Sequence, residues 1–340
     1  MPRKKIEKNL AYDDQKRLYY VYFDYGVDWT GKRCRKTRTF SNLKDAKVAL
    51  LSFEVDKLQG NVIQPNSITV DRWLNYWLEG VIKPNREYTT YYCYQCIIKN
   101  HVSPGLGDTL LQKLTPYKIQ QYYANIIQEK GLSTNTVHKH HILLHTSLKM
   151  AYQQGVISEN PLDKVEPPRT ISPHQVYYTP SQLRKLFQVA EGTWLEVVIK
   201  LGGYLGLRRG EICGLRWENI NMDEKMLHIK LTRTTTGSAT VEKEPKTDHS
   251  TRTLGIDGLD DLIQILQKTR LDQVERKKLM GDHYSDSGYV LVKSDGKPRD
   301  PNQVTRELKK FVLKNKLPPI TVHGLRHTFA SVANRAHIPL

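Results

Sequence analysis

The sequence contains few cysteines, fewer acidic than basic residues, and no long apolar run. Four cysteines among 340 residues are too few for a disulfide framework. No stretch approaches the length of about 18 apolar residues that a transmembrane helix needs. The opening segment MPRKKIEKNLAYDD has no apolar stretch, which argues against a secretory signal. We therefore expect a soluble protein of a reducing, intracellular compartment, with no membrane partner.

Positive charge is what the chain has in excess. Lys and Arg number 52 against 35 Asp and Glu, so the formal net charge is +17. Basic residues outnumber acidic ones in each of the segments 1–66, 67–170 and 171–340. A polyanion that touches the whole length is the expected partner, and nucleic acid fits best. A generally basic surface without a specific partner is the alternative.

Two turn-rich segments divide the chain. Residues 60–66 are polar, and residues 161–173 contain several prolines that disfavour helix. We therefore expect domains at 1–63, 67–165 and 174–340. The predicted fold is multidomain and mainly α, with small β-sheets: an N-terminal β-sheet plus helix, a helical bundle, and an α+β domain.

The first segment predicts a cationic ribbon. Residues 18–23 and 33–40 are strand-like, and a helix capped by Ser41 or Asn42 is expected over 43–58. Basic residues recur along the second strand at Arg33, Arg35, Lys36 and Arg38. Such a ribbon can contact DNA phosphates. A solvated edge strand protected by its charges is the alternative interpretation.

Capping signals predict helices further along. Thr69, Thr115, Ser133 and Thr179 each precede a helical apolar pattern. Further helices are expected at 195–207, from Pro301 and from Thr321. Strands are expected at 226–231, 241–246 and 251–256, with the last two paired as a hairpin beside the first.

Three places in the last segment carry chemistry. In Gly206–Leu215, Arg208 can grip a phosphate, and Glu211 lies three residues on, placed to hold that arginine. Lys246, between two predicted strands, can give a proton to a leaving oxygen. His323 and Arg326 share one face at a predicted helix start, where free N–H groups suit an anion. A surface ion pair, a solvated turn lysine and a chance motif are the ordinary readings of these places.

Metal chemistry has little support. The pair Cys93 and Cys96 lies within a probable helix and has no second pair, so no zinc site is expected. The cluster of His138, His140, His141 and His145 includes an i,i+4 pair without a carboxylate or cysteine nearby in that helix. It indicates a DNA-facing or packed helix.

Taken in order, the three motifs resemble the tyrosine recombinase, or phage integrase, family. They are Gly-Leu-Arg-x-x-Glu, Pro-Lys-Thr and His-Gly-Leu-Arg-His-Thr, with Arg326 lying 118 positions after Arg208. Residues 67–165 resemble the family's core-binding domain. Residues 1–63 resemble the arm-type DNA-binding domain of integrases of temperate phages and conjugative transposons. Residues 174–340 resemble the catalytic domain.

The resemblance implies a function. Arg208 and Arg326 would bind the scissile phosphate, Lys246 would protonate the 5′-oxygen, and His323 would assist proton transfer. The family rejoins DNA through a 3′-phosphotyrosyl bond and needs no metal or nucleotide cofactor. Its partners would be double-stranded DNA at attachment sites, further copies in a tetramer, and, as an open alternative, an excision factor. The place would be the cytoplasm of a bacterial or phage-infected cell.

Two elements of the family pattern are absent from the sequence: a further histidine or tryptophan, and the nucleophilic tyrosine after it. The nucleophilic tyrosine follows the His-x-x-Arg motif in the family, and here no tyrosine follows Tyr289. We expect a recombinase truncated within its catalytic domain, which binds DNA without cleaving it. A natural non-catalytic DNA-binding remnant or regulator, and completion of the site by another polypeptide, are the alternatives. A metal-dependent nuclease and a type IB topoisomerase are more distant readings.

Overall fold

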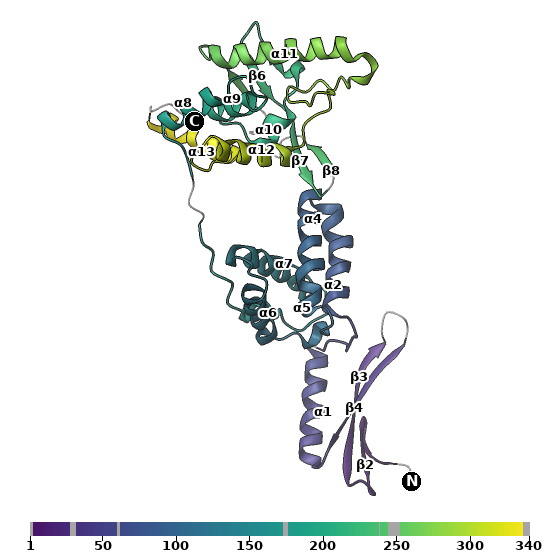
Figure 1. The fold of residues 1–340 in the computed structure, drawn as a ribbon. Coiled ribbons are helices and arrows are strands. Elements are labelled where there is room, and N and C mark those ends of the chain that lie inside the picture. Colours follow the sequence, from purple (N-terminus) through teal and green to yellow (C-terminus); the bar gives the residue numbers. More distant parts are fainter. Residues whose placement is uncertain are drawn as a thin grey trace. The chain divides into compact units, whose positions relative to one another are not determined.

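The computed structural model describes residues 3–27, 32–59, 62–172, 176–237, 239–243 and 252–335. Contacts divide the chain into two compact units, 1–172 and 173–340. As expected, the fold is mainly helical with small antiparallel sheets (Figure 1). No helix in the described ranges is long and apolar enough to cross a membrane. The boundary expected near residues 63–67 stays a prediction.

The N-terminal part is a meander with one helix packed on it. Its antiparallel sheet has the order β1-β2-β3-β4 and comprises β1 (Lys4–Glu7), β2 (Leu10–Asp13), β3 (Leu18–Val27) and β4 (Arg33–Phe40). Helix α1 (Leu43–Leu58) begins after the Asn42 cap, as the sequence predicts. The small core joins Leu10, Val21 and Phe23 of the sheet to Ala46 and Leu50 of the helix. Strand β4, which carries the basic residues, lies at the edge of this sheet.

The middle part is a helical bundle. Its main helices are α2 (Val70–Trp77), α4 (Tyr88–Ile97), α6 (Pro116–Gln128) and α7 (Thr134–Gln153). The first two continue through π-helical turns, Leu78–Ile82 and Ile98–Val102, into the short helices α3 (Lys83–Asn85) and α5 (Ser103–Leu106). Thr69, Thr115 and Ser133 cap their helices as predicted, because each hydroxyl accepts a backbone N–H of the first turn.

Of the four histidines of α7, His140 is buried and the other three are partly exposed. His140 is fully buried and shares a hydrogen bond of 3.0 Å between its Nδ1 and the hydroxyl of Tyr122. Burial and the nearby His101 lower the pKa of His140 to about 4. Within the described part of the chain, no group of three or more His, Cys, Asp or Glu side chains is placed to hold a metal ion.

The C-terminal unit surrounds a buried helix. Helix α9 (Leu195–Leu205) is packed by α8 (Pro180–Ala190), α11 (Asp260–Met280) and α13 (Val322–Arg335). Helices α10 (Arg209–Gly214) and α12 (Pro301–Lys314) complete the helical part. The Thr179–Gln182 capping box opens α8, as the sequence predicts.

The strand pairing in this unit differs from the predicted one. One sheet has the order β5-β6-β9, formed by β5 (Ile220–Asn221), β6 (Met226–Ile229) and β9 (Arg252–Gly255). The other pairs β7 (Thr232–Thr236) with β8 (Ala239–Lys243). The predicted hairpin between 241–246 and 251–256 is therefore wrong over the described residues. The threonine-rich β7 lacks the apolar alternation that would have revealed it as the partner of β8.

Candidate active site

The site begins where α9 ends. Gly206 adopts a left-handed conformation with φ of 60° and terminates the helix. A Cβ atom at this position would lie 2.5 Å from the ring of Phe329, so the close approach of α13 also requires glycine. Leu207 then anchors the chain in the core, and Arg208 stands in extended conformation at the start of α10. This turn presents the Arg208 side chain to solvent on a rigid base.

Glu211 is the buried centre of the site. It is only 3% exposed, and its carboxylate accepts hydrogen bonds from two arginines. Arg208 donates its backbone N–H at 2.9 Å and its Nη1 at 2.8 Å. Arg252, on β9, donates Nη1 at 3.1 Å and Nη2 at 2.9 Å. Burial alone would raise the pKa of Glu211, but these hydrogen bonds outweigh it and lower the pKa.

Helix α13 brings the second motif to this place. The Nη1 of Arg326 donates to the carbonyl oxygen of Gly206 at 2.5 Å. Gly202 of α9 has Leu325 against it, so the two helices approach closely. Burial, followed by repulsion from Arg208, lowers the pKa of Arg326. The guanidinium groups of Arg208 and Arg326 are thus close enough to repel, and an anion between them would relieve that repulsion.

His323 faces the same region from the first turn of α13. Its pKa is lowered by burial and by the neighbouring charges of His327, Arg326 and Arg208. A pocket of about 430 Å³ joins the two motifs. It is lined by Arg208, Arg209, Gly210, Thr232, Thr234, Thr305, Thr321, Val322 and His323. The pocket therefore offers cations, hydroxyl groups and an imidazole whose pKa is lowered.

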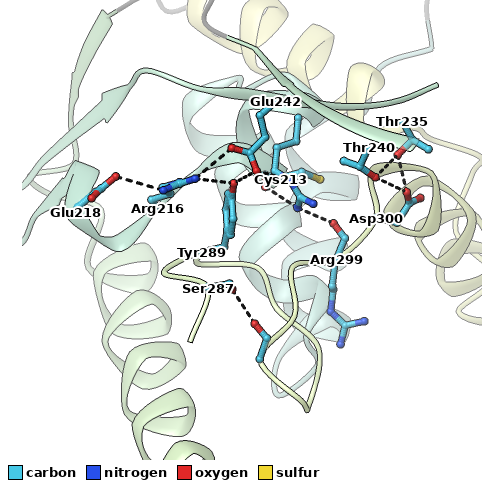
Figure 2. A network of polar contacts seen from close by, with 12 residues as sticks. Cys213, Arg216, Glu218, Thr235, Thr240, Glu242, Ser287, Tyr289, Arg299 and Asp300 are labelled. Atoms are coloured by element: carbon cyan, nitrogen blue, oxygen red, sulfur yellow. Dashed lines mark hydrogen bonds and ion pairs between the residues drawn. The ribbon is translucent and has the colours of Figure 1, made fainter. Parts of the chain in front are cut away.

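A polar network anchors the β7–β8 hairpin beside the site (Figure 2). Glu242 of β8 accepts hydrogen bonds from the hydroxyl of Tyr289 and, at 3.1 Å, from Nη2 of Arg216. The guanidinium groups of Arg216 and Arg233 lie over the Tyr289 ring, at 4.7 and 4.8 Å from its centroid. Arg233 also donates to the carbonyl oxygen of Arg299 at 3.1 Å. Strand β8 is thus fixed up to its end at Lys243, while Lys246 lies outside the described residues.

The basic residues of β4 form a separate surface. Arg33 and Arg35 reach Asp24 of β3 at 2.5 and 3.5 Å. Arg38 stacks over the ring of Phe23 at 5.7 Å, and Lys36 is exposed. The hydrogen bond from Arg33 is the main cause that lowers the pKa of Asp24, followed by the N–H of Gly26. All four cations stay accessible, and their contact with DNA remains a prediction.

Sequence reasoning missed Arg252 and Tyr289. Arg252 supplies half of the side-chain hydrogen-bond partners of Glu211, yet it lies 41 residues away in the sequence. Its only local signal is a charged residue at the start of a predicted strand. Tyr289 has no motif around it, and its role as a platform for two arginines follows from tertiary packing alone.

Comparisons with known proteins show which family the chain resembles. The model of the phage integrase family matches residues 177–340, and that of the phage integrase N-terminal SAM-like domain matches residues 69–127. A tyrosine recombinase XerC-like protein of Caldanaerobacter subterraneus is 26% identical over 96% of this chain and 87% of its own length. The ICEBs1 integrase of Bacillus subtilis is 24% identical over 92% of this chain and 85% of its own.

Solved structures share the fold. The integrase of transposon Tn1549, in complex with transposon right end DNA, superposes with a TM-score of 0.66 at 20% identity. The match covers 80% of this chain and 88% of that one. A lambda integrase tetramer bound to a Holliday junction gives a TM-score of 0.60 at 19% identity, over 98% and 94% of the two chains. The chain belongs to the phage integrase family of tyrosine recombinases, which are enzymes that break and rejoin DNA.

Proposed function

We propose that the domains of this chain are those of a site-specific recombinase. They bind double-stranded attachment-site DNA and hold one phosphate in place for strand exchange. The observation that carries the proposal is the convergence of Arg208, which Glu211 holds, with Arg326 and His323 from the other end of the domain. Relatives supply context, since the Tn1549 and lambda integrases were solved bound to DNA and one of them as a tetramer. A tetramer on paired DNA sites is therefore part of the proposal.

In this proposal the arginines act on the phosphate. Arg208 and Arg326 bind its non-bridging oxygens and stabilise the charge that builds up in the transition state. Arg208 can do so because Glu211 fixes its backbone and its Nη1 and leaves the rest of the fork accessible. Arg326 is fixed from the other side by the Gly206 carbonyl. Glu211 is thus a positioning residue, since it acts through the arginines.

Two further residues move protons. As a tyrosine hydroxyl oxygen bonds to phosphorus, the bond from phosphorus to the 5′-oxygen breaks. Lys246 gives that leaving oxygen a proton, and His323 takes up the proton that the hydroxyl loses. The lowered pKa of His323 supports this role, because only a neutral imidazole can accept a proton.

The polypeptide of residues 1–340 contributes no nucleophile in this proposal, because no tyrosine follows the His-x-x-Arg motif. It binds DNA and forms no covalent adduct by itself. A tyrosine from outside these residues, in the same reading frame or on another polypeptide, completes the reaction. Sequencing the coding DNA beyond codon 340 separates these cases: an open frame with a tyrosine one or two helices later supports a recombinase, and a stop codon favours a DNA-binding remnant or completion in trans.

Duplex binding at several salt concentrations tests the phosphate contacts. Arg208→Ala and Arg326→Ala should each reduce the slope of log K against log salt by about 1. Arg276→Ala, an exposed arginine on α11, is the matched control and should leave the slope nearly unchanged. Unchanged slopes in both site variants would contradict the phosphate assignment. A denaturant-stable adduct on nicked DNA would contradict the assignment of a nucleophile from elsewhere.

A further inference from the structure

Helix α1 is apolar on two opposite faces. Its inner face contributes Ala46 and Leu50 to the core against the sheet. Its outer face carries four large apolar side chains that point away from that core. They are Val48, Leu51, Val55 and Leu58, with exposed fractions of 60%, 64%, 43% and 90%. Other exposed apolar residues, such as Leu279 on α11 at 86%, do not form such a row.

We call Val48, Leu51, Val55 and Leu58 the outer stripe of α1. The sequence spacing of these residues indicates a second helix as the partner. Successive members are three, four and three residues apart, which is the a-d-a-d pattern of a coiled coil. Valine occupies the a positions 48 and 55, and leucine occupies the d positions 51 and 58. Within parallel coiled coils, β-branched residues at a with leucine at d favour two strands over three or four. The stripe is therefore complementary to itself.

The flanks of the stripe also fit a second copy. In a parallel pair, Lys47 at a g position would face Ser52 of the second copy, and Glu54 would face Gln59 of the second copy. Neither contact places like charges together. Lys44 occupies the preceding d position, so the apolar seam is confined to residues 48–58.

We propose that the outer stripe of α1 pairs with the same stripe of a second copy of this chain while both copies are bound to DNA. This inference rests on the proposed function, which places two copies on neighbouring DNA sites. Eleven helical residues span only about 16 Å. The surface area that such a short seam buries is well below the roughly 800 Å² per partner of a stable protein interface. The pair forms when DNA raises the effective concentration of the second copy, and free chains stay monomeric.

Cooperative DNA binding tests the inference with the full 340-residue chain. Duplexes selected for binding by the wild type would carry either one site or two adjacent sites. Wild type should bind the second site at least tenfold more tightly than the first, whereas Leu51→Lys should lose this cooperativity and keep its one-site affinity. Leu279→Lys adds the same charge at another exposed leucine and should behave as wild type. Retained cooperativity in Leu51→Lys would overturn the proposal, and loss of one-site binding by the wild type would overturn the proposed function instead.

Disulfide trapping tests the parallel arrangement and does not depend on affinity. In a background with Cys34→Ser and Cys93→Ser, two chains that carry Leu51→Cys should cross-link to each other at this position on two-site DNA under oxidation. Asp56→Cys, which lies off the stripe on the same helix, should not. Cross-linking only between a Val48→Cys chain and a Leu58→Cys chain would show antiparallel pairing and overturn the arrangement proposed here. Equal cross-linking of Asp56→Cys would show nonspecific contact and overturn it as well.

Discussion

The carboxylates of Glu211 and Asp24 each hold two arginines, and they do so in different surroundings. Glu211 is buried in the C-terminal unit and receives Arg208 from its own helix and Arg252 from a distant strand. Asp24 lies on β3 and receives Arg33 and Arg35 from the neighbouring strand β4. Both carboxylates have a lowered pKa. The same local chemistry therefore appears once inside a core and once on an edge hairpin.

The difference shows what burial adds to an ion pair. At Glu211, the carboxylate is only 3% exposed, so water replaces a lost arginine poorly and the carboxylate depends on its two partners. At Asp24, the arginines remain half or more exposed, and water competes for every contact. We infer that the first arrangement serves precision in placing Arg208, and the second leaves cations available to a partner.

Removing the buried charge should have the largest effect. Glu211→Gln leaves Arg252 and part of Arg208 without a carboxylate, and breaking a buried pair costs about 3–5 kcal/mol. We expect about 3 kcal/mol, because both arginines can reach some water. Denaturant unfolding of the C-terminal unit would measure the loss. Asp24→Asn should change the unfolding free energy far less, and an equal loss in both variants would contradict the comparison.

Weakening one partner should have an intermediate effect. Arg252→Lys keeps the charge but cannot make two parallel hydrogen bonds to Glu211, so we expect a loss of about 1–2 kcal/mol. Arg252→Met should destabilise more than Arg252→Lys. Arg33→Lys is the matched change at Asp24, and its unfolding curve should overlay that of the wild type. A stability of Arg252→Met equal to that of the wild type would show that Arg208 alone satisfies Glu211.

The pH dependence of stability should reveal the contribution of Glu211 as a smaller effect. The pKa of Glu211 is lower in the folded than in the unfolded protein, so its stabilising contribution is complete above the ordinary glutamate pKa of about 4.3. That contribution is lost as the pH falls through the folded pKa. Stability measured from pH 6 to pH 3 should therefore decline less steeply in Glu211→Gln than in wild type. Parallel declines would show that Glu211 titrates normally.

The smallest effect is expected at the exposed pair. Asp24→Asn releases Arg33 and Arg35 and removes a negative charge near any bound phosphate, so duplex affinity should rise by a few-fold at low salt. Asp14→Asn removes the same charge from an exposed position in the N-terminal part and is the control. A gain that persists unchanged at high salt, or one that Asp14→Asn reproduces, would argue against a DNA role for β4.

Local signals predicted most of the elements and motif positions. Thr69, Thr115 and Thr179 were correctly predicted as helix caps, since a cap depends on residues only three apart. Pairing partners were not predictable in the same way. The β7–β8 pairing and the reach of Arg252 to Glu211 depend on tertiary packing, for which the sequence carries no local pattern. The family motifs located Arg208 and Arg326, but the contact of Arg326 with the Gly206 carbonyl became visible only in the structure.

The contact between Arg326 and the Gly206 carbonyl also determines when this part of the site can form during synthesis of the chain. The two groups lie 120 residues apart in the chain, and α13 packs directly on α9. While a ribosome is still making residues 252–321, α9 has no α13 against it, and Arg208 stands without its partner arginine. The proposed phosphate site therefore forms late, after the basic N-terminal part has left the ribosome. If the proposed function holds, a nascent chain can approach DNA electrostatically well before it can hold a phosphate in a defined position.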